Sequence, residues 1–570
     1  MQEQLKKLIG KALQKIKVGA GFSPDDVLIE IPNGEEFGDF STNIAMQYAK
    51  KFGKNPREIA ELIRTNFPKN DIVEKIEIAG PGFLNLFLTD QFLQTELQKF
   101  DPEKKLNLGK GVKICLDSSH PNIAKPLHFG HLRSTIIGEA LTRILRQAGY
   151  DVLHDNFLGD WGTQFGKLVV AIKKWGNMDE ISVSEHPIDE LVRLYQKFHE
   201  EAEKNPELEK EGAEEFRKME MEQNAENLKL WKWIVEESLR EVQKFYKYID
   251  ASFDLIRGES FYEKMLPQAL ELLRTSGVGS VGEKGALIVQ FPEETKLPPM
   301  IFQRADGATL YQTRDICRIL LYEKESINIM IHVVGSDQSL HFRQLFQTAK
   351  MLGLKPQCEH TSYGLVRLPE GKMSTRKGNI VGLQEVLQEA EERVRQILKE
   401  RKVDFSEEEK NALVHTLAVG AVKFNDLSQN RNTTVVFEWD KMLSFEGFSA
   451  PFLQYSYARA RSIFRKDEEQ GKTKFGASDL MLKEKPERQL AKKILDFPAV
   501  VLLAAEKRMP HFIAQYVYEL AARFNHFYAE CPILPAAEAE KKARLYLTEK
   551  MCETLKQGLY LLGINVPERM

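Results

Sequence analysis

A short apolar run that leads through a proline-containing turn into a helix is the feature that most constrains this chain. Residues 112–116 (Val-Lys-Ile-Cys-Leu) predict a buried strand. Pro121 and Pro126 keep the following residues out of helix, and apolar side chains recur at helical spacing from Leu132 onward. The helix is expected to begin near Gly130. A strand, a turn and a helix in this order favour an α/β fold.

The start of that helix carries residues suited to binding an anion. The first N–H groups of a helix have no partner inside it, and the helix dipole is positive at this end. His128, Gly130 and His131 lie there, and Lys125 comes just before them. One histidine alone would indicate a core residue. Two histidines beside a lysine on one strand-to-helix turn indicate a cluster of cations that binds a negatively charged ligand.

Two later strands also end in turns with polar residues. A strand from Asp151 is expected to end near Asn156, so that the turn 159–162 (Gly-Asp-Trp-Gly) projects into the crevice at the carboxyl ends of the strands. A β-branched strand at 329–334 is followed by Gly335 and Asp337. The glycine permits close approach of a ligand, and the carboxylate can accept a hydrogen bond from a ribose hydroxyl.

A predicted helix and a basic loop complete the candidate site. If residues 309–321 are helical, Tyr311 and Asp315 lie on one face, four residues apart. Residues 371–379 (Gly-Lys-Met-Ser-Thr-Arg-Lys-Gly-Asn) form a loop with three cations between glycines. Such a loop is a weak signal alone. The presence of His128 and His131 on the same chain makes this signal strong.

Composition restricts the function classes. The 570 residues suffice for about three domains, and a charged fraction of 29% is typical of a soluble globular protein. A net charge of −3 argues against a uniformly basic nucleic-acid binder, so RNA contacts must come from local patches. The five cysteines form no Cys-x-x-Cys pair, which indicates neither a zinc site nor a disulfide framework. With no apolar leader and no membrane-length apolar run, we expect a cytoplasmic enzyme that does not contact a membrane.

The run 121–134 (Pro-Asn-Ile-Ala-Lys-Pro-Leu-His-Phe-Gly-His-Leu-Arg-Ser) resembles the nucleotide-binding signature of arginyl-tRNA synthetases, which are class I aminoacyl-tRNA synthetases. The loop 371–379 resembles the Lys-Met-Ser-Lys loop of that class, with Thr375 in place of the second lysine. Lys125 or Lys377 is a candidate substitute for that lysine. Runs in the first 90 residues, such as 37–43 (Phe-Gly-Asp-Phe-Ser-Thr-Asn), resemble the N-terminal domain of the same family.

This resemblance implies a multidomain α/β protein. Residues 1–105 would form an α+β N-terminal domain that binds the tRNA elbow. Residues 106–449 would form a Rossmann-type catalytic domain with a parallel sheet, an insertion at about 167–300 and a helical connector at about 382–449. Residues 450–570 would form an all-helical anticodon-binding domain. In this last segment, 20 Lys and Arg residues outnumber 15 Asp and Glu residues, so its basic excess suits RNA.

The resemblance also implies the reaction. Arginine attacks the α-phosphate of ATP to form arginyl-adenylate, with Mg²⁺ on the phosphates, and the arginyl group then passes to the 3′ end of tRNA(Arg). No general base is needed, because the attacking carboxylate is already ionised. The reaction instead needs the substrates positioned for in-line attack and the charge on the leaving pyrophosphate stabilised. The substrates are thus L-arginine, ATP and tRNA(Arg), and a monomer is expected.

Residue roles carry over by position in the matching motifs. The catalytic residues would be His128, His131, Lys125 and Lys372. ATP would be bound by His128, Gly130, His131, Gly335, Asp337, Lys372, Met373 and Ser374. Arginine would be bound by Asn122, Glu259, Tyr311, Asp315 and Gln338, since a planar guanidinium is best held by carboxylates. Tyr455, Arg459 and Arg461 would contact tRNA, because aromatic rings stack on bases and cations bind phosphates. No metal is expected to be bound by protein ligands.

Three alternatives remain open at this point. A different class I synthetase, for example one that charges cysteine, should carry zinc-ligand cysteines. A non-catalytic paralogue that only binds RNA should have lost His128, His131 or Lys372, and all three are present. A free-standing nucleotidyltransferase would not need the terminal RNA-binding modules.

Overall fold

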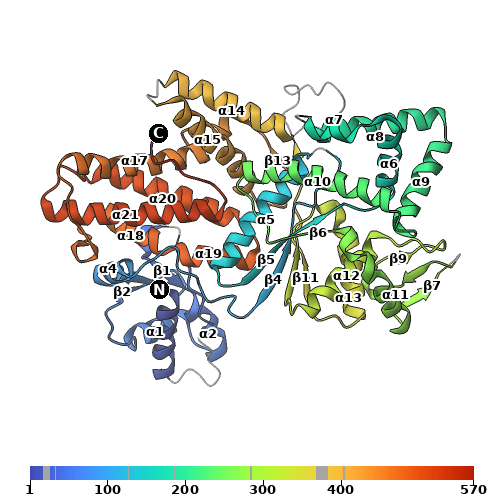
Figure 1. Cartoon of the computed structure of the whole chain (residues 1–570). Coiled ribbons are helices and arrows are strands. Elements are labelled where there is room, and N and C mark those ends of the chain that lie inside the picture. Colours follow the sequence, from blue (N-terminus) through green and yellow to red (C-terminus); the bar gives the residue numbers. More distant parts are fainter. Residues whose placement is uncertain are drawn as a thin grey trace. The chain divides into compact units, whose positions relative to one another are not determined.

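The computed structural model describes residues 1–16, 26–32, 34–125, 127–184, 186–282, 285–367, 383–401 and 405–570. The chain divides into two units, and Figure 1 labels helices and strands of both. Unit 1 comprises Met1–Asp101, Lys466–Asp496 and Arg523–Met551, and unit 2 comprises Pro102–Arg465, Phe497–Ala522 and Cys552–Met570. The division passes through helices α17 (Ala450–Glu469), α20 (His511–Glu530) and α21 (Glu538–Leu561).

A five-stranded parallel sheet forms the core of unit 2, with the strand order β11-β10-β4-β5-β6. This confirms the predicted parallel α/β fold. The predicted strand at 112–116 is β4, and β5 runs two residues beyond its expected end near Asn156. The strands are β4 (Lys113–Asp117), β5 (Asp151–Leu158), β6 (Leu255–Gly258), β10 (Ile329–His332) and β11 (Gln357–His360).

Helix α5 (Phe129–Gln147) connects β4 to β5 and begins within one residue of the predicted start. It is buried along most of its length. A Cβ atom at Gly138 would lie 2.1 Å from the Ser118 Oγ, so only glycine allows the helix to approach the end of β4 this closely. The helix N-terminus is therefore fixed at the carboxyl ends of the strands.

A helical segment lies between β5 and β6 and has a core of its own. Phe165, Phe198 and Ile234 come from three of its helices, and all three side chains are fully buried. The charged residues of this segment cover its outside, as a solvated helical face does. The helices are α6 (Thr163–Trp175), α7 (Met178–Val183), α8 (Pro187–Lys204), α9 (Glu207–Glu220) and α10 (Ala225–Tyr248).

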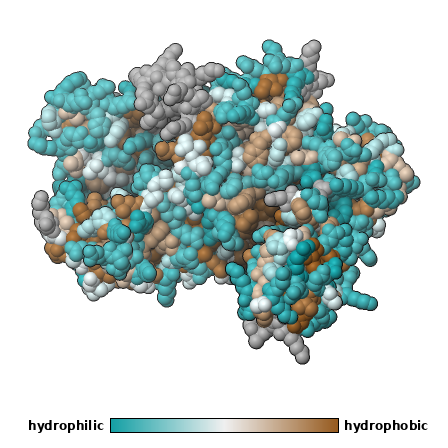
Figure 2. Space-filling view, turned by 180° about the vertical axis from the view of Figure 1, so that it is seen from behind, coloured by the Kyte–Doolittle hydropathy of each residue, from teal (hydrophilic) through white to brown (hydrophobic). Residues whose placement is uncertain are grey.

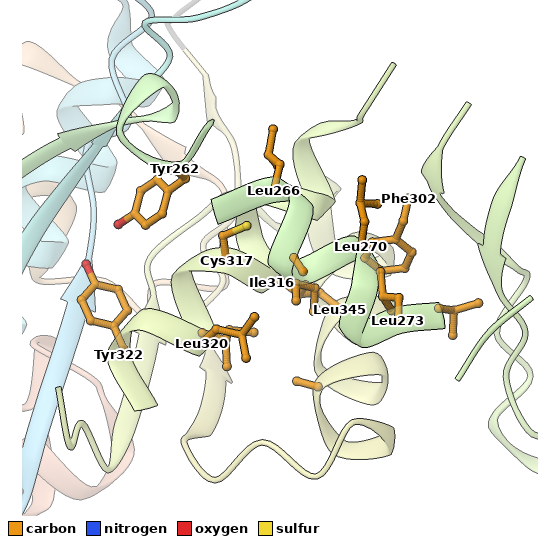
Figure 3. Close-up of a cluster of buried hydrophobic side chains, with 14 of the residues drawn as sticks. Tyr262, Leu266, Leu270, Leu273, Phe302, Ile316, Cys317, Leu320, Tyr322 and Leu345 are labelled. Carbon is orange, nitrogen blue, oxygen red and sulfur yellow. The ribbon is translucent and has the colours of Figure 1, made fainter. Parts of the chain in front are cut away.

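After β6 the chain forms a second core, which supports helix α12 (Tyr311–Lys324). Figure 3 shows Ile316, Cys317 and Leu320 of α12 in one cluster with apolar side chains of α11 and α13. This cluster fixes one side of α12 and leaves its polar residues for the opposite side. The preceding elements are the 3-10 helices η3 (Glu259–Met265) and η5 (Glu293–Thr295), helix α11 (Leu266–Thr275), and an antiparallel sheet of β7 (Gly279–Val281), β8 (Leu287–Val289) and β9 (Met300–Gln303).

The chain from β10 to α16 is mainly helical. The expected helical connector at about 382–449 contains one strand, because β13 (Val435–Val436) pairs in parallel with β12 (Val366–Arg367). A two-residue strand leaves too short a pattern to detect in sequence. The other elements are η6 (Ser336–Gln338), α13 (Ser339–Met351), α14 (Leu383–Glu400), α15 (Glu407–Leu427) and α16 (Trp439–Met442).

In unit 1 the N-terminal residues form the predicted α+β module. A three-stranded antiparallel sheet has the order β1-β3-β2, and Leu84, Leu86 and Leu88 of β3 are buried, as their alternation predicts. The Asp39 carboxylate accepts from both terminal nitrogens of Arg488, at 2.9 and 2.7 Å. The elements are α1 (Gln2–Lys15), η2 (Glu35–Phe37), β1 (Phe40–Thr42), α2 (Ile44–Phe52), α3 (Pro56–Thr65), β2 (Val73–Ala79), β3 (Phe83–Leu88) and α4 (Asp90–Gln98).

The described C-terminal residues from 450 onward contain helices and no strand. Helix α20 carries apolar residues at helical spacing, and Ile513, Val517, Leu520, Phe524 and Phe527 are fully buried. The remaining elements are η7 (Ala477–Asp479), α18 (Lys485–Leu495) and α19 (Phe497–Lys507).

The face of the molecule in Figure 2 is mostly hydrophilic, with hydrophobic side chains in separate patches. No helix among the described residues combines the length and the apolar character that a bilayer crossing requires.

Candidate active site

The site forms where the strand order of the parallel sheet reverses. Strand β4 has β5 on one side and β10 on the other, and such a switch point is where open α/β sheets bind ligands. The register places Asp155, Asp117 and His332 next to one another, on β5, β4 and β10. All three are buried at the carboxyl half of their strands. The floor of the site is therefore a row of titratable side chains.

The two signature histidines cap helix α5. The Gly130 N–H donates to the His128 Nδ1 at 3.1 Å, and the His128 N–H donates to the His131 Nδ1 at 3.1 Å. The two rings stack with centroids 3.8 Å apart. A ring nitrogen that accepts carries no proton, so each neutral ring carries its proton on Nε2. The cap thus leaves one N–H donor on each ring for a ligand.

The protonation state corrects one prediction. Burial, with His128 and His120 nearby, lowers the pKa of His131 to about 3, and burial lowers the pKa of His128. Both rings are neutral at pH 7 in the ligand-free protein, so the expectation that they are cations was wrong. Lys125 is exposed in the loop before the helix.

The segment after β10 meets the start of α5 through Tyr363. The Ser336 N–H donates to the Tyr363 carbonyl at 3.0 Å, and the Tyr363 hydroxyl donates to the Gly130 carbonyl at 3.3 Å. Gly335 and Asp337 are therefore held near the helix start, although about 200 residues separate them from it in sequence. A Cβ atom at Gly335 would lie 2.5 Å from the Asp337 Oδ1, so a side chain there would displace the Asp337 carboxylate.

Helix α12 brings Asp315 to a second part of the site. The Asp315 Oδ2 lies 3.0 Å from the His341 Nε2, and its Oδ1 lies 3.7 Å from the Arg318 Nη1. The Tyr311 ring lies 4.8 Å from the His341 ring, between centroids, and half of Tyr311 is exposed. Tyr311 and Asp315 therefore lie on one face, as predicted.

Glu259 lies among carboxyl groups. It follows β6 directly, and its Oε2 is 3.8 Å from the Arg314 Nε. Burial raises the pKa of Glu259 to about 7; Arg314 opposes this rise, and Asp160, Asp315 and Glu263 add to it. Arg314 binds Glu263 more closely, at 2.7 Å. Acidic groups thus outnumber cations here, and a cationic ligand would relieve their repulsion.

The other two predicted arginine ligands, Asn122 and Gln338, contact other residues. Asn122 is exposed and forms a backbone bridge with Gly159 at the end of β5. Gln338 is exposed in η6, and its amide donates to the Asp337 carboxylate at 3.2 Å. Within the described ranges, no hydrogen bond joins Asn122 or Gln338 to Asp315. Lys372, Met373 and Ser374 lie outside the described residues.

The predicted tRNA contacts all lie on α17. The Arg459 guanidinium lies 5.4 Å from the centroid of the Tyr455 ring. The Arg461 Nε forms an ion pair with the Glu568 carboxylate at 2.8 Å. Arg461 therefore already has an acidic partner within the chain.

Several residues of the site escaped the sequence analysis. Asp117 and Arg318, neither of which the sequence singled out, form an ion pair at 2.9 Å in the floor. Asp160, from the predicted turn 159–162, accepts from the Ser260 N–H at 2.9 Å. His341 and Tyr363 link the two parts of the site. Asp117 ends the first strand and His341 follows Gln338 by three residues, so both could have been suspected from position. Nothing in the sequence pairs Tyr363 with Gly130.

Three family models match the chain in succession. The arginyl-tRNA synthetase N-terminal domain matches residues 3–88, the catalytic domain of class I (R) tRNA synthetases matches residues 94–439, and the DALR anticodon-binding domain matches residues 453–570.

Full-length relatives carry the same architecture. The arginine–tRNA ligase of Fusobacterium nucleatum is 43% identical over 95% of both chains, and that of Halothermothrix orenii is 38% identical over 100% of this chain and 99% of the relative. The solved arginyl-tRNA synthetases of Plasmodium falciparum and Thermus thermophilus are each 27% identical, with TM-scores of 0.83 and 0.82. Both alignments cover 100% of this chain, with 99% of the first structure and 100% of the second.

Proposed function

The chain belongs to the arginyl-tRNA synthetase family and is an arginine–tRNA ligase, and from this premise we propose which of its residues carry out the reaction. The proposal rests on the acid-rich cluster around Glu259 and Asp315. Arginine keeps its positive charge at all physiological pH values, and carboxylates bind its planar fork best.

We propose that arginine lies between Asp315 and Glu259, with the Tyr311 hydroxyl as a further partner. Asn122 and Gln338 are proposed to hold the α-amino group at the other end of the substrate. A pocket that leaves buried carboxylates unpaired strongly rejects a substrate without the guanidinium. Selection of arginine therefore follows from charge as well as from shape.

ATP is proposed to bind at the start of α5. Its phosphates would accept from the Nε2–H groups of His128 and His131 and from N–H groups near Gly130, beside Lys125. Gly335 would allow the nucleoside to approach β10, and Asp337 would accept from the ribose. Lys372, Met373 and Ser374 are proposed to contact ATP by position in their motif.

Mg²⁺ is proposed as the accompanying ion. It prefers oxygen ligands and is commonly held by substrate phosphates, so the chemistry of this site fits it without a dedicated protein cage. When bound, it would neutralise charge on the leaving pyrophosphate. The His128 and His131 donors and Lys125 would orient the triphosphate for in-line attack by the arginine carboxylate.

The rest of the chain is proposed to bind tRNA(Arg). We propose domains at residues 1–105, 106–449 and 450–570, with the first on the tRNA elbow and the last on the anticodon. Tyr455 and Arg459 would contact bases and phosphates, and Arg461 would do so if it exchanged Glu568 for a phosphate. The enzyme is proposed to act as a monomer in the cytoplasm.

A charging assay tests this assignment. The purified chain is incubated with ATP, Mg²⁺, total tRNA and each radiolabelled amino acid in turn, and label in acid-precipitable tRNA is counted. Arginine alone should be incorporated. Incorporation of another amino acid in preference to arginine would overturn the proposed pocket.

Arginine affinity should depend on pH through Glu259. Its pKa of about 7 means that the carboxylate, the form that pairs with guanidinium, is lost as the pH falls below 7. The dissociation constant for arginine, measured by calorimetry, should rise about tenfold from pH 8 to pH 6. Glu259→Gln should bind arginine more weakly and show a flat profile over this range. A profile equally steep in Glu259→Gln would assign the titration to another group.

Gly130→Ala should slow adenylate formation about tenfold. The added Cβ would lie 2.9 Å from the His128 Cε1, so the ring must move and lose its bond from the Gly130 N–H. Pyrophosphate exchange in the presence of tRNA measures the effect. Gly476→Ala is the matched control, because nothing lies within 4 Å of a Cβ atom there. Equal rates in both variants would show that the His128 ring position is unimportant.

A further inference from the structure

Two side chains from different elements contact the Asp315 carboxylate. The His341 Nε2, from the first turn of α13, lies 3.0 Å from Oδ2, and the Arg318 Nη1, one turn further along α12, lies 3.7 Å from Oδ1. Asp315 and His341 are about 10% exposed, and Arg318 is 2% exposed. The contacts are thus shielded from solvent, where charged hydrogen bonds are strongest.

Arg318 is largely neutralised by other groups. Its Nη2 lies 2.9 Å from the Asp117 Oδ2 and 3.4 Å from the Asp155 Oδ2, both on the floor of the site. Its guanidinium also lies 4.1 Å from the centroid of the Phe157 ring. Arg318 therefore belongs mainly to the floor, and its contact with Asp315 is the longest of the three. Asp315 keeps negative charge available for a substrate.

The His341 ring packs against two other aromatic rings. Its centroid lies 4.8 Å from that of Tyr311 and 5.1 Å from that of Phe342. An ionised carboxylate can only accept, so Nε2 must carry the proton. Nδ1 is buried and has no hydrogen-bond partner among the described residues, as suits an unprotonated nitrogen. His341 is therefore a fixed donor aimed at Asp315.

We propose that His341 is a positioning residue for the selection of arginine. The terminal torsion of an aspartate side chain is broad, so an unsupported carboxylate rotates freely about its Cβ–Cγ bond. Two parallel bonds to a guanidinium require one orientation of the carboxylate plane. The bond from His341 to Oδ2 fixes that plane before arginine arrives, which reduces the ordering cost of binding. This role rests on the proposed arginine site at Asp315.

The test compares a variant that loses the donor with one that keeps it. His341→Leu removes the N–H, whereas His341→Gln places an amide N–H near the position of Nε2. In the charging reaction with saturating tRNA, His341→Leu should raise the arginine KM about tenfold and leave kcat and the ATP KM within about twofold. His341→Gln should keep the arginine KM within about threefold of the parent. His341→Leu combined with Asp315→Asn should be no worse than Asp315→Asn alone.

His415→Leu is the matched control, because His415 also pairs with a carboxylate, at 3.2 Å from Glu391. The arginine KM of His415→Leu should not change. An unchanged arginine KM in His341→Leu, beside a raised one in Asp315→Asn, would overturn the positioning role alone. An equal rise of the ATP KM and the arginine KM in His341→Leu would also overturn it. The same holds if the arginine KM rises equally in His341→Leu and His341→Gln. An unchanged arginine KM in Asp315→Asn would overturn the arginine site itself.

Discussion

Asparagine in place of Asp315 is expected to raise the arginine KM of the charging reaction about 100-fold, while the ATP KM stays within about twofold. The substitution keeps the shape of the side chain but removes the charge that pairs with the guanidinium. Losing one partner of a buried, hydrogen-bonded charge pair costs about 3 kcal/mol, which corresponds to about 100-fold. The substrate charge then enters the pocket without its counter-charge, so binding of arginine is affected far more than that of ATP.

Asp306→Asn is the matched control for this substitution. Asp306 lies in the turn just before α12, where it accepts from the Ala308 N–H at 3.1 Å and pairs with Arg304 at 2.8 Å. It has no contact with the acid-rich cluster among the described residues, so the arginine KM should not change. A normal arginine KM in the Asp315 variant would remove this carboxylate from the pocket and leave Glu259 as the main acidic candidate.

The second large effect is expected at His131. His131→Asn should lower the rate of adenylate formation about 100-fold, with the arginine KM within about threefold. An asparagine oxygen replaces Nδ1 as acceptor for the His128 N–H, so the helix cap is retained, but the Nε2–H donor is lost. Removing one donor that faces developing charge in a transition state costs about 100-fold or more in rate. Pyrophosphate exchange in the presence of tRNA separates this rate from arginine binding.

His131→Gln tests the explanation, because its amide reaches about as far as Nε2 and restores a donor. It should recover a large part of the rate lost in His131→Asn. His199→Asn, at a partly exposed position on α8, should have no effect. If His131→Gln and His131→Asn were equally slow, the ring would act through the helix cap or packing and not as a donor.

Much of the fold could be predicted because its signals are local. The apolar run before the signature, the helical spacing from Leu132 and the β-branched strand before Gly335 each identify one element from a few residues. These elements formed where expected, to within a few residues. The short strand β13 escaped because two residues carry no period, and its pairing with β12 is decided by distant chain segments.

Sequence analysis proposed the residue types of the candidate site but not the protonation of its side chains. The sequence places His128 and His131 beside a helix start, yet it does not say how deeply they are buried. Burial lowers the pKa of both rings, so that neutral donors replace the expected cations. Burial has the opposite effect on Glu259. It raises the pKa of this carboxyl group, and neighbouring carboxyl groups from other elements raise it further.

The sequence by itself therefore determined the local elements around the signature and the motifs at the strand ends, and the resemblance that those motifs carry implied the parallel sheet. Only the tertiary structure decided that His341 faces Asp315, that Tyr363 reaches Gly130, and that Arg318 lies across Asp117 and Asp155. Periodicity and turn chemistry depend on neighbours in the chain, and a sequence contains them. Desolvation and charge pairing depend on neighbours in space, and these exist only once the sheet and its helices have packed.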